Sequence, residues 1–146
     1  MRVYLDCCCL QRPLDDQTHP RIRVETEAVF AVLAAVQAKE LSLLGSEALR
    51  YEVNRIPDET RRVDALAVLS LASENLQITD AVEALALRLE QQGLAAMDAV
   101  HLALASTAKA DFFCTCDDKF LRKAQSIPGL GCNMIALLNL IPEVIK

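Results

Sequence analysis

The sequence predicts an α/β fold, a three-layer α/β/α sandwich built around a central, mostly parallel sheet. Short apolar segments of strand length alternate along the chain with amphipathic segments of helix length. This alternation is typical of a parallel sheet that helices cover on both faces. The chain has 146 residues and is 53% hydrophobic, so a single domain, 1–146, can bury its own core.

Composition and charge exclude several classes of protein. A chain with this hydrophobic content and 24% charged residues is not intrinsically disordered. The formal net charge is −5, only 4% of the residues are aromatic, and Trp is absent. A protein that binds nucleic acid through phosphate contacts or base stacking alone is normally basic or rich in aromatic residues. Any nucleic-acid function of this chain therefore requires a recruited cation.

The sequence predicts a cytoplasmic protein with no attachment to a membrane. No segment approaches the roughly 18 uninterrupted apolar residues of a transmembrane helix, and Asp6 stands where a signal peptide needs an apolar core. The cysteines are then expected to be reduced. Their spacing matches neither a disulfide framework nor a zinc or thioredoxin motif, which favours small buried apolar side chains. They are Cys7–Cys9, Cys114, Cys116 and Cys132.

The first third of the chain predicts two strands with a helix between them. An apolar, β-rich run at Arg2–Cys8 indicates a buried strand, and residues 9–21, with two Pro and two Asp, indicate a loop. Apolar residues at helical spacing predict a helix over Val24–Lys39. Leu41–Gly45 is the expected second strand.

Capping residues mark the next helices. Ser46 is expected to cap a helix that runs through Val53, and Asp58 to cap a second helix after the break at Pro57. Asp80–Glu83 resembles a capping arrangement for a helix that ends at Gly93. The remaining expected elements are a strand near Leu76–Thr79, an apolar helix Ala95–Ala108, a strand Asp111–Thr115, a helix from Asp117 or Asp118 to Gln125, a strand Cys132–Leu138, and a turn or short helix Ile141–Ile145.

Four acidic residues stand where a parallel sheet binds its ligands, outside the carboxyl ends of strands. Asp6 and Asp117 follow strands, Asp98 lies near the start of an apolar helix, and Glu52 lies on the helix after the second strand. Each alone has an ordinary explanation except Asp6. Asp98 is favoured at the positive end of a helix, Asp117 as an N-cap, and Glu52 by pairing with Arg55.

Taken together, these acids indicate a metal site. Four carboxylates that converge in one cleft repel each other and stay ionised only with a bound cation. Oxygen ligands of this kind select Mg²⁺ or Mn²⁺. The chemistry that fits is hydrolysis of a phosphodiester, in which the metal neutralises phosphate charge and activates water.

Three acidic segments resemble the motifs of the PIN-domain nucleases, a family that includes the VapC-like toxins of bacterial toxin–antitoxin pairs. They are MRVYLD at residues 1–6, AMDAVHLA at 96–103, and FCTCDDKF at 113–120. Ser46 followed by Glu52 is similar to the remaining motif, a glutamate after the second strand. The resemblance spans essentially the whole chain and implies a PIN-like fold.

The resemblance also implies a function. It implies a Mg²⁺- or Mn²⁺-dependent ribonuclease acting on single-stranded RNA, paired with an antitoxin protein and with a second copy of itself as a homodimer. Carried over motif by motif, the catalytic metal ligands are Asp6, Glu52, Asp98 and Asp117.

Three residues remain as alternatives or additions to this ligand set. Asp118 is the alternative to Asp117, although the Thr-x-Asp-x-x-Phe spacing favours Asp117, and Glu47 is the alternative to Glu52. His101 lies one helical turn after Asp98. It is either a proton carrier beside the metal or a buried helix residue.

The chain departs from the family pattern immediately after its first Asp. Family members usually carry a Ser or Thr and then an Asn there, whereas this chain has Cys7 and Cys8. A thiol is a weak hydrogen-bond donor, so support for the metal is reduced. The alternative function is accordingly a non-catalytic PIN-fold interaction module with a degenerate metal site.

Overall fold

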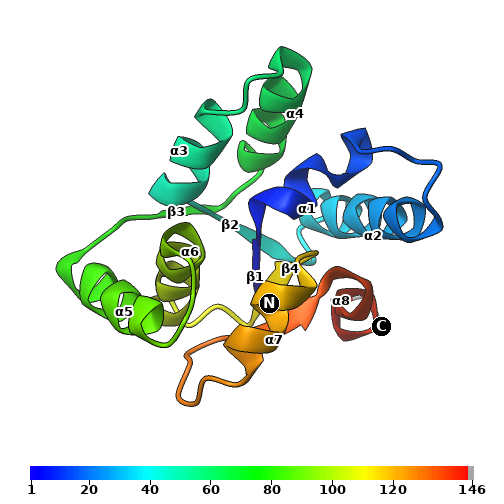
Figure 1. Cartoon of the computed structure of the whole chain (residues 1–146). Helices are drawn as coiled ribbons and strands as arrows, with labels where there is room; N and C mark the ends of the chain where they lie inside the picture. The colour runs from blue at the N-terminus through cyan, green and yellow to red at the C-terminus, as the bar shows by residue number, and fades with distance from the viewer. Residues whose placement is uncertain (145–146) are drawn as a thin grey trace.

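The computed structural model describes residues 1–144 and contains one sheet of five parallel strands. The strands run in the spatial order β3-β2-β1-β4-β5 (Figure 1). The mostly parallel sheet expected from the sequence is thus entirely parallel. The strands are β1 Arg2–Leu5, β2 Ser42–Ser46, β3 Glu74–Leu76, β4 Phe112–Thr115 and β5 Asn133–Ala136.

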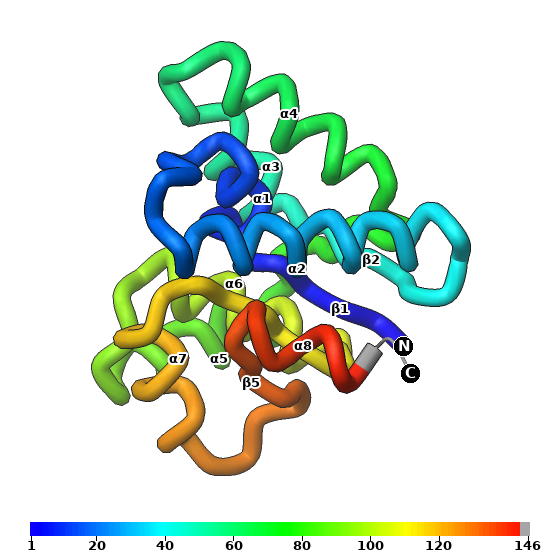
Figure 2. Tube along the Cα trace, turned by 90° about the vertical axis from the view of Figure 1, so that its right-hand side faces the viewer, coloured from blue at the N-terminus to red at the C-terminus, as the bar shows by residue number. Residues whose placement is uncertain are grey.

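Helices cover both faces of this sheet and complete the three-layer sandwich. Helices α2 and α8 lie against each other on one face, whereas α5, α6 and α7 lie on the other (Figures 1 and 2). Within residues 1–144, no helix is both long and apolar enough to cross a membrane. The helices are α1 Cys7–Gln11, the 3₁₀ turn η1 Arg12–Leu14, α2 Pro20–Gln37, α3 Glu47–Asn54, α4 Glu59–Leu69, α5 Asp80–Gln91, α6 Ala96–Thr107, α7 Asp118–Gln125 and α8 Leu137–Val144.

The core is centred on β1 and β4, the two strands in the middle of the sheet. Tyr4 and Phe113 are fully buried and stack with ring centroids 5.0 Å apart, and Phe120 of α7 packs edge-on against Phe113. The small residues of α6 allow this apolar helix to pack closely on the sheet. This packing holds the carboxyl ends of β1 and β4 in register, with Leu5 opposite Cys114.

The prediction for the segment after the first strand was wrong. Strand β1 ends at Leu5 rather than Cys8, and Cys7–Gln11 forms the short helix α1 where the sequence suggests strand and then loop. Asp6 is the N-cap of this helix, and its side chain accepts a hydrogen bond from the Cys7 backbone N–H. The apolar run conceals the boundary because cysteines fit either a buried strand or a buried helix.

Several other boundaries and caps differ from expectation. Helix α2 begins earlier, with Pro20 in its first turn, and β3 lies slightly earlier than Leu76–Thr79. Helix α5 is capped by Thr79, whose hydroxyl accepts from the Val82 N–H, rather than by Asp80. The last strand stops at Ala136 because α8 begins at Leu137. Ile145, where the expected terminal turn ends, lies outside the described residues.

Candidate metal centre

All four predicted ligands line one cleft at the carboxyl end of the sheet. The strand order reverses at β1 and β4, whose carboxyl ends therefore open a crevice between the connections that leave them. The cleft has a volume of about 310 Å³. It is lined by Asp6, Cys7, Cys8, Gln11, Glu52, Ile56, Asp98 and Asp117.

Asp6 is the most buried of the four acids, with a relative exposure of 8%. One carboxylate oxygen accepts from the Cys7 N–H and the other from the Thr115 hydroxyl, both at 2.8 Å. Burial raises the pKa of Asp6 to about 7, and the neighbouring Cys8 and Glu52 act in the same direction. The carboxyl group is therefore rigidly oriented and costly to ionise without a cation.

Asp98 stands in the first turn of α6, a position that suits a carboxylate. Its surroundings nevertheless raise its pKa to about 6, chiefly through burial and then through the charges of Asp6 and Asp117. This mutual repulsion is the behaviour expected of carboxylates that share one cleft.

Glu52 reaches the cleft from α3 and is held by a buried hydrogen-bond chain. Its Oε1 lies 2.9 Å from His101 Nε2, and His101 Nδ1 lies 2.6 Å from the Tyr4 hydroxyl, which is 2.7 Å from Ser46 Oγ. With a neutral His101, every donor and acceptor of this hydrogen-bond chain has a partner. Nε2–H donates to the carboxylate, Nδ1 accepts from Tyr4, Ser46 donates to Tyr4, and Ser46 Oγ accepts from the Leu49 N–H.

This hydrogen-bond chain explains two features that the sequence left open. His101 is a buried helix residue that positions Glu52, so it contacts the acid rather than the cleft itself. Glu52 pairs with His101 instead of Arg55, whose guanidinium lies 5.2 Å from the ring centre of the exposed Tyr51.

The alternatives Asp118 and Glu47 lie away from the cleft. Both carboxylate oxygens of Asp118 accept from Arg21, at 2.7 and 2.8 Å, on the surface. Glu47 accepts from the Ile78 backbone N–H at 2.6 Å. Asp117 lines the cleft and at the same time caps α7, accepting from the N–H groups of Lys119 and Phe120. The structure thus brings together the four residues preferred from the sequence.

Tyr4, Ser46 and Thr115 support the site but were not identified as site residues from the sequence. Tyr4 and Thr115 lie on apolar strands within the family motifs, and Ser46 marks a helix cap and the start of the glutamate motif, but none of the three was given a role in the site. The separation in sequence, 97 positions from Tyr4 to His101 and 109 from Asp6 to Thr115, leaves no local pattern to detect.

Replacing Tyr4 with Phe tests the hydrogen-bond chain that ends at Glu52. We expect Tyr4→Phe to lower the free energy of unfolding by about 1–3 kcal/mol, because His101 Nδ1 is left buried without a partner. Denaturant unfolding measures this change. The control is Tyr51→Phe, whose hydroxyl-bearing ring is 57% exposed and whose change should be close to zero. Equal stabilities of the two variants would contradict the assigned hydrogen bonds.

The donor set of the cleft fits a hard divalent cation. Within residues 1–144, none of the four carboxylates forms an ion pair with Lys or Arg, and the ion-pair partner of Glu52 is His101. A carboxylate oxygen of Asp6 and one of Glu52 lie within 4.8 Å of each other and of a ring nitrogen of His101, and both His101 nitrogens are already hydrogen-bonded. The oxygen donors of four carboxylates suit Mg²⁺ or Mn²⁺ better than a softer metal.

Fold and cleft together define an α/β protein with an acidic site at the carboxyl ends of its parallel strands. The chain belongs to the PIN domain family, whose family model matches residues 3–125. A chain of the VapBC2 complex from Rickettsia felis, solved bound to a DNA fragment from its promoter, has a similar fold. The TM-score is 0.59 at 18% identity, over 93% of this chain and 98% of that one. No curated protein matches the sequence.

Proposed function

We propose that this protein is a metal-dependent endoribonuclease that acts as the toxin of a type II toxin–antitoxin pair. The observation that carries the proposal is the convergence of Asp6, Glu52, Asp98 and Asp117 on one cleft, without a Lys or Arg ion-pair partner among residues 1–144. PIN domains are generally nucleases, which supports a hydrolase.

The four carboxylates hold Mg²⁺ or Mn²⁺, which supplies neutralisation of phosphate charge and activation of water when bound. The Thr115 hydroxyl and the Cys7 N–H fix both oxygens of Asp6. His101 orients Glu52 through Nε2–H. The protein's own contribution is thus to place charged oxygens in a fixed geometry before the metal and the substrate arrive.

The rim of the cleft supports a nucleic-acid substrate. Lys119 and Lys123 line a smaller cavity of about 130 Å³ that shares Asp98 and Asp117 with the main cleft. Basic side chains there suit contact with the phosphates of a nucleic-acid strand.

Cleavage of single-stranded RNA by the full chain, with and without metal, tests the proposal. We expect cleavage in Mg²⁺ or Mn²⁺ and none in excess EDTA. Cleavage that persists in EDTA would contradict the metal-dependent mechanism. Binding of Mn²⁺ without cleavage would favour the alternative, an interaction module, since Cys7 and Cys8 then fail to support catalysis. A cytoplasmic location stays a prediction from the sequence.

The proposal includes an antitoxin protein and a homodimer. The similar fold in the VapBC2 complex supports the former, and apolar side chains exposed on α2 and α5, such as Phe30 and Leu87, support an interface. Light scattering should give about twice the chain mass of 16.0 kDa. A mass of one chain at all concentrations would contradict the homodimer.

A further inference from the structure

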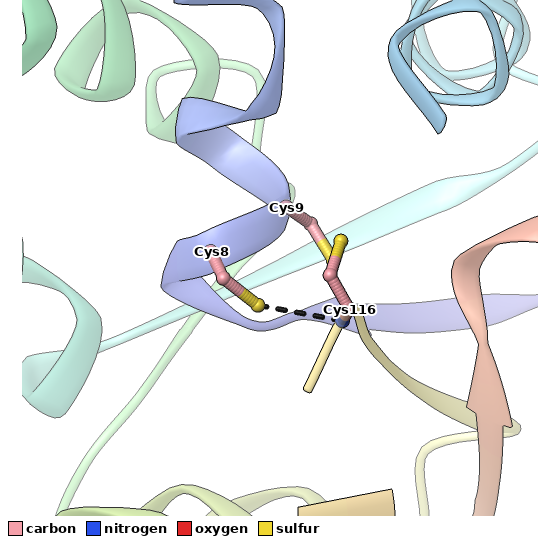
Figure 3. A group of neighbouring side chains, drawn as sticks. All are labelled: Cys8, Cys9 and Cys116. Atoms are coloured by element: carbon pink, nitrogen blue, oxygen red, sulfur yellow. Dashed lines mark hydrogen bonds between the residues drawn. The ribbon is translucent and has the colours of Figure 1, made fainter. Parts of the chain in front are cut away.

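A cluster of three cysteines adjoins the acidic cleft, whose lining includes Cys8. The Sγ atoms of Cys8, Cys9 and Cys116 all lie within 4.8 Å of one another, and those of Cys9 and Cys116 are 3.6 Å apart. Cys8 and Cys9 come from α1, and Cys116 follows β4 (Figure 3). All three are free thiols. The folded chain therefore collects three soft donors from segments more than 100 positions apart.

We propose that Cys8, Cys9 and Cys116 form a binding site for a soft, thiophilic cation, with Cu(I) as the preferred occupant. This site is separate in chemistry from the cleft, because sulfur ligands select soft metals and carboxylates select hard ones. The proposal does not depend on the nuclease activity.

The distances suit a cation at the centre of the three sulfurs. A metal–sulfur bond of about 2.3 Å places three sulfurs roughly 4 Å apart around one ion. The sulfurs of this cluster lie between 3.6 Å and 4.8 Å from one another. The separations in the folded chain therefore bracket the value that a bound ion requires.

The surroundings of the sulfurs favour a bound cation. Cys9 is fully buried and Cys116 is 8% exposed, whereas Cys8 is partly exposed and opens toward the cleft. The backbone N–H of Cys116 donates to Cys8 Sγ at 3.4 Å (Figure 3). Such a hydrogen bond stabilises charge on a thiolate. A cation can thus enter through Cys8 and lose its water against the buried pair.

The number of ligands favours Cu(I) over Zn²⁺. Structural Zn²⁺ requires four ligands in a tetrahedron, whereas the cluster within residues 1–144 offers three. Three thiolates are a complete set for monovalent copper. Binding is not a redox step: each coordinating thiol releases its proton to solvent as its sulfur binds the metal.

Competition for Cu(I) tests this site. The full chain, reduced and free of oxygen, is titrated against bathocuproine disulfonate, a coloured Cu(I) chelator. We expect the wild type to withdraw one equivalent of copper, and Cys116→Ser and Cys8→Ser to bind it at least tenfold more weakly. The matched control is Cys132→Ser, which is also 8% exposed but stands apart from the cluster, and which should bind as the wild type does.

Two further controls separate loss of the copper site from other effects of a substitution. Asp98→Asn should withdraw copper normally, because the carboxylates are not ligands of the soft ion. Circular dichroism confirms that each serine variant is folded, and the partly exposed Cys8 provides a mild substitution if Cys116→Ser unfolds. Wild-type protein that leaves all copper on the chelator, or cluster variants that match Cys132→Ser, would overturn the proposal. Binding of Zn²⁺ but not Cu(I) would overturn the choice of metal.

Discussion

Asp6→Asn should abolish RNA cleavage, lowering the rate by roughly a thousandfold or more. Asp6 lies at the centre of the site, where its two oxygens are oriented by the Cys7 N–H and the Thr115 hydroxyl. Exchange for an amide removes one negative charge and one metal-binding oxygen. A loss of about 4 kcal/mol of transition-state stabilisation corresponds to a factor of about a thousand. The measurement is the rate of RNA cleavage at saturating Mn²⁺.

Asp118→Asn is the matched control for this loss. Asp118 is an aspartate of the same region, but it faces solvent and pairs with Arg21. Its loss should leave cleavage within a few-fold of the wild type. If Asp118→Asn abolished cleavage while Asp6→Asn kept it, the assignment of the cleft as the catalytic centre would be wrong.

In the absence of metal, the same Asp6→Asn substitution should raise stability at neutral and alkaline pH. The pKa of Asp6 is raised to about 7 in the folded protein, compared with an ordinary value of 3.8. Between these values the folded state keeps a proton that the unfolded state has released, so the free energy of unfolding falls as pH rises. Three pKa units correspond to about 4 kcal/mol at most. The neutral amide does not incur this loss.

Thermal melts in EDTA across the range from about pH 5.5 to pH 8.5 test the prediction. The melting temperature of Asp6→Asn should exceed that of the wild type by most at the alkaline end of this range and by least at the acid end. Asp98→Asn should behave in the same direction to a smaller extent, since its pKa is raised only to about 6. If Asp98 served only its own helix terminus, Asp98→Asn would instead lose about 0.3–1 kcal/mol.

Adding Mg²⁺ to the wild type should restore part of the stability lost at alkaline pH. A tenfold excess over the dissociation constant contributes roughly 1.4 kcal/mol to the free energy of unfolding. The gain should be much smaller in Asp6→Asn, which lacks one charged ligand. An undiminished Mg²⁺ shift in the variant would show that the ion binds elsewhere.

The sequence by itself determined the architecture of this protein. The alternation of apolar strands with amphipathic helices predicts a parallel α/β sandwich, and that prediction is confirmed. The caps at Ser46 and Asp58 are confirmed as well, because each acts on a backbone N–H three residues away. Periodicity and capping are local interactions, so they leave a pattern that can be read within a few positions of the chain.

Only the tertiary structure decided which side chains meet. From the sequence, Asp117 and Asp118 are neighbours of identical chemistry, yet one lines the cleft and the other pairs with Arg21. The support that Tyr4 and His101 give to Glu52 is equally invisible in the sequence, as is the contact of Cys9 with Cys116. These contacts join residues far apart in the chain. Their geometry is set by how β1, α3, α6 and β4 pack, which no short window of sequence encodes.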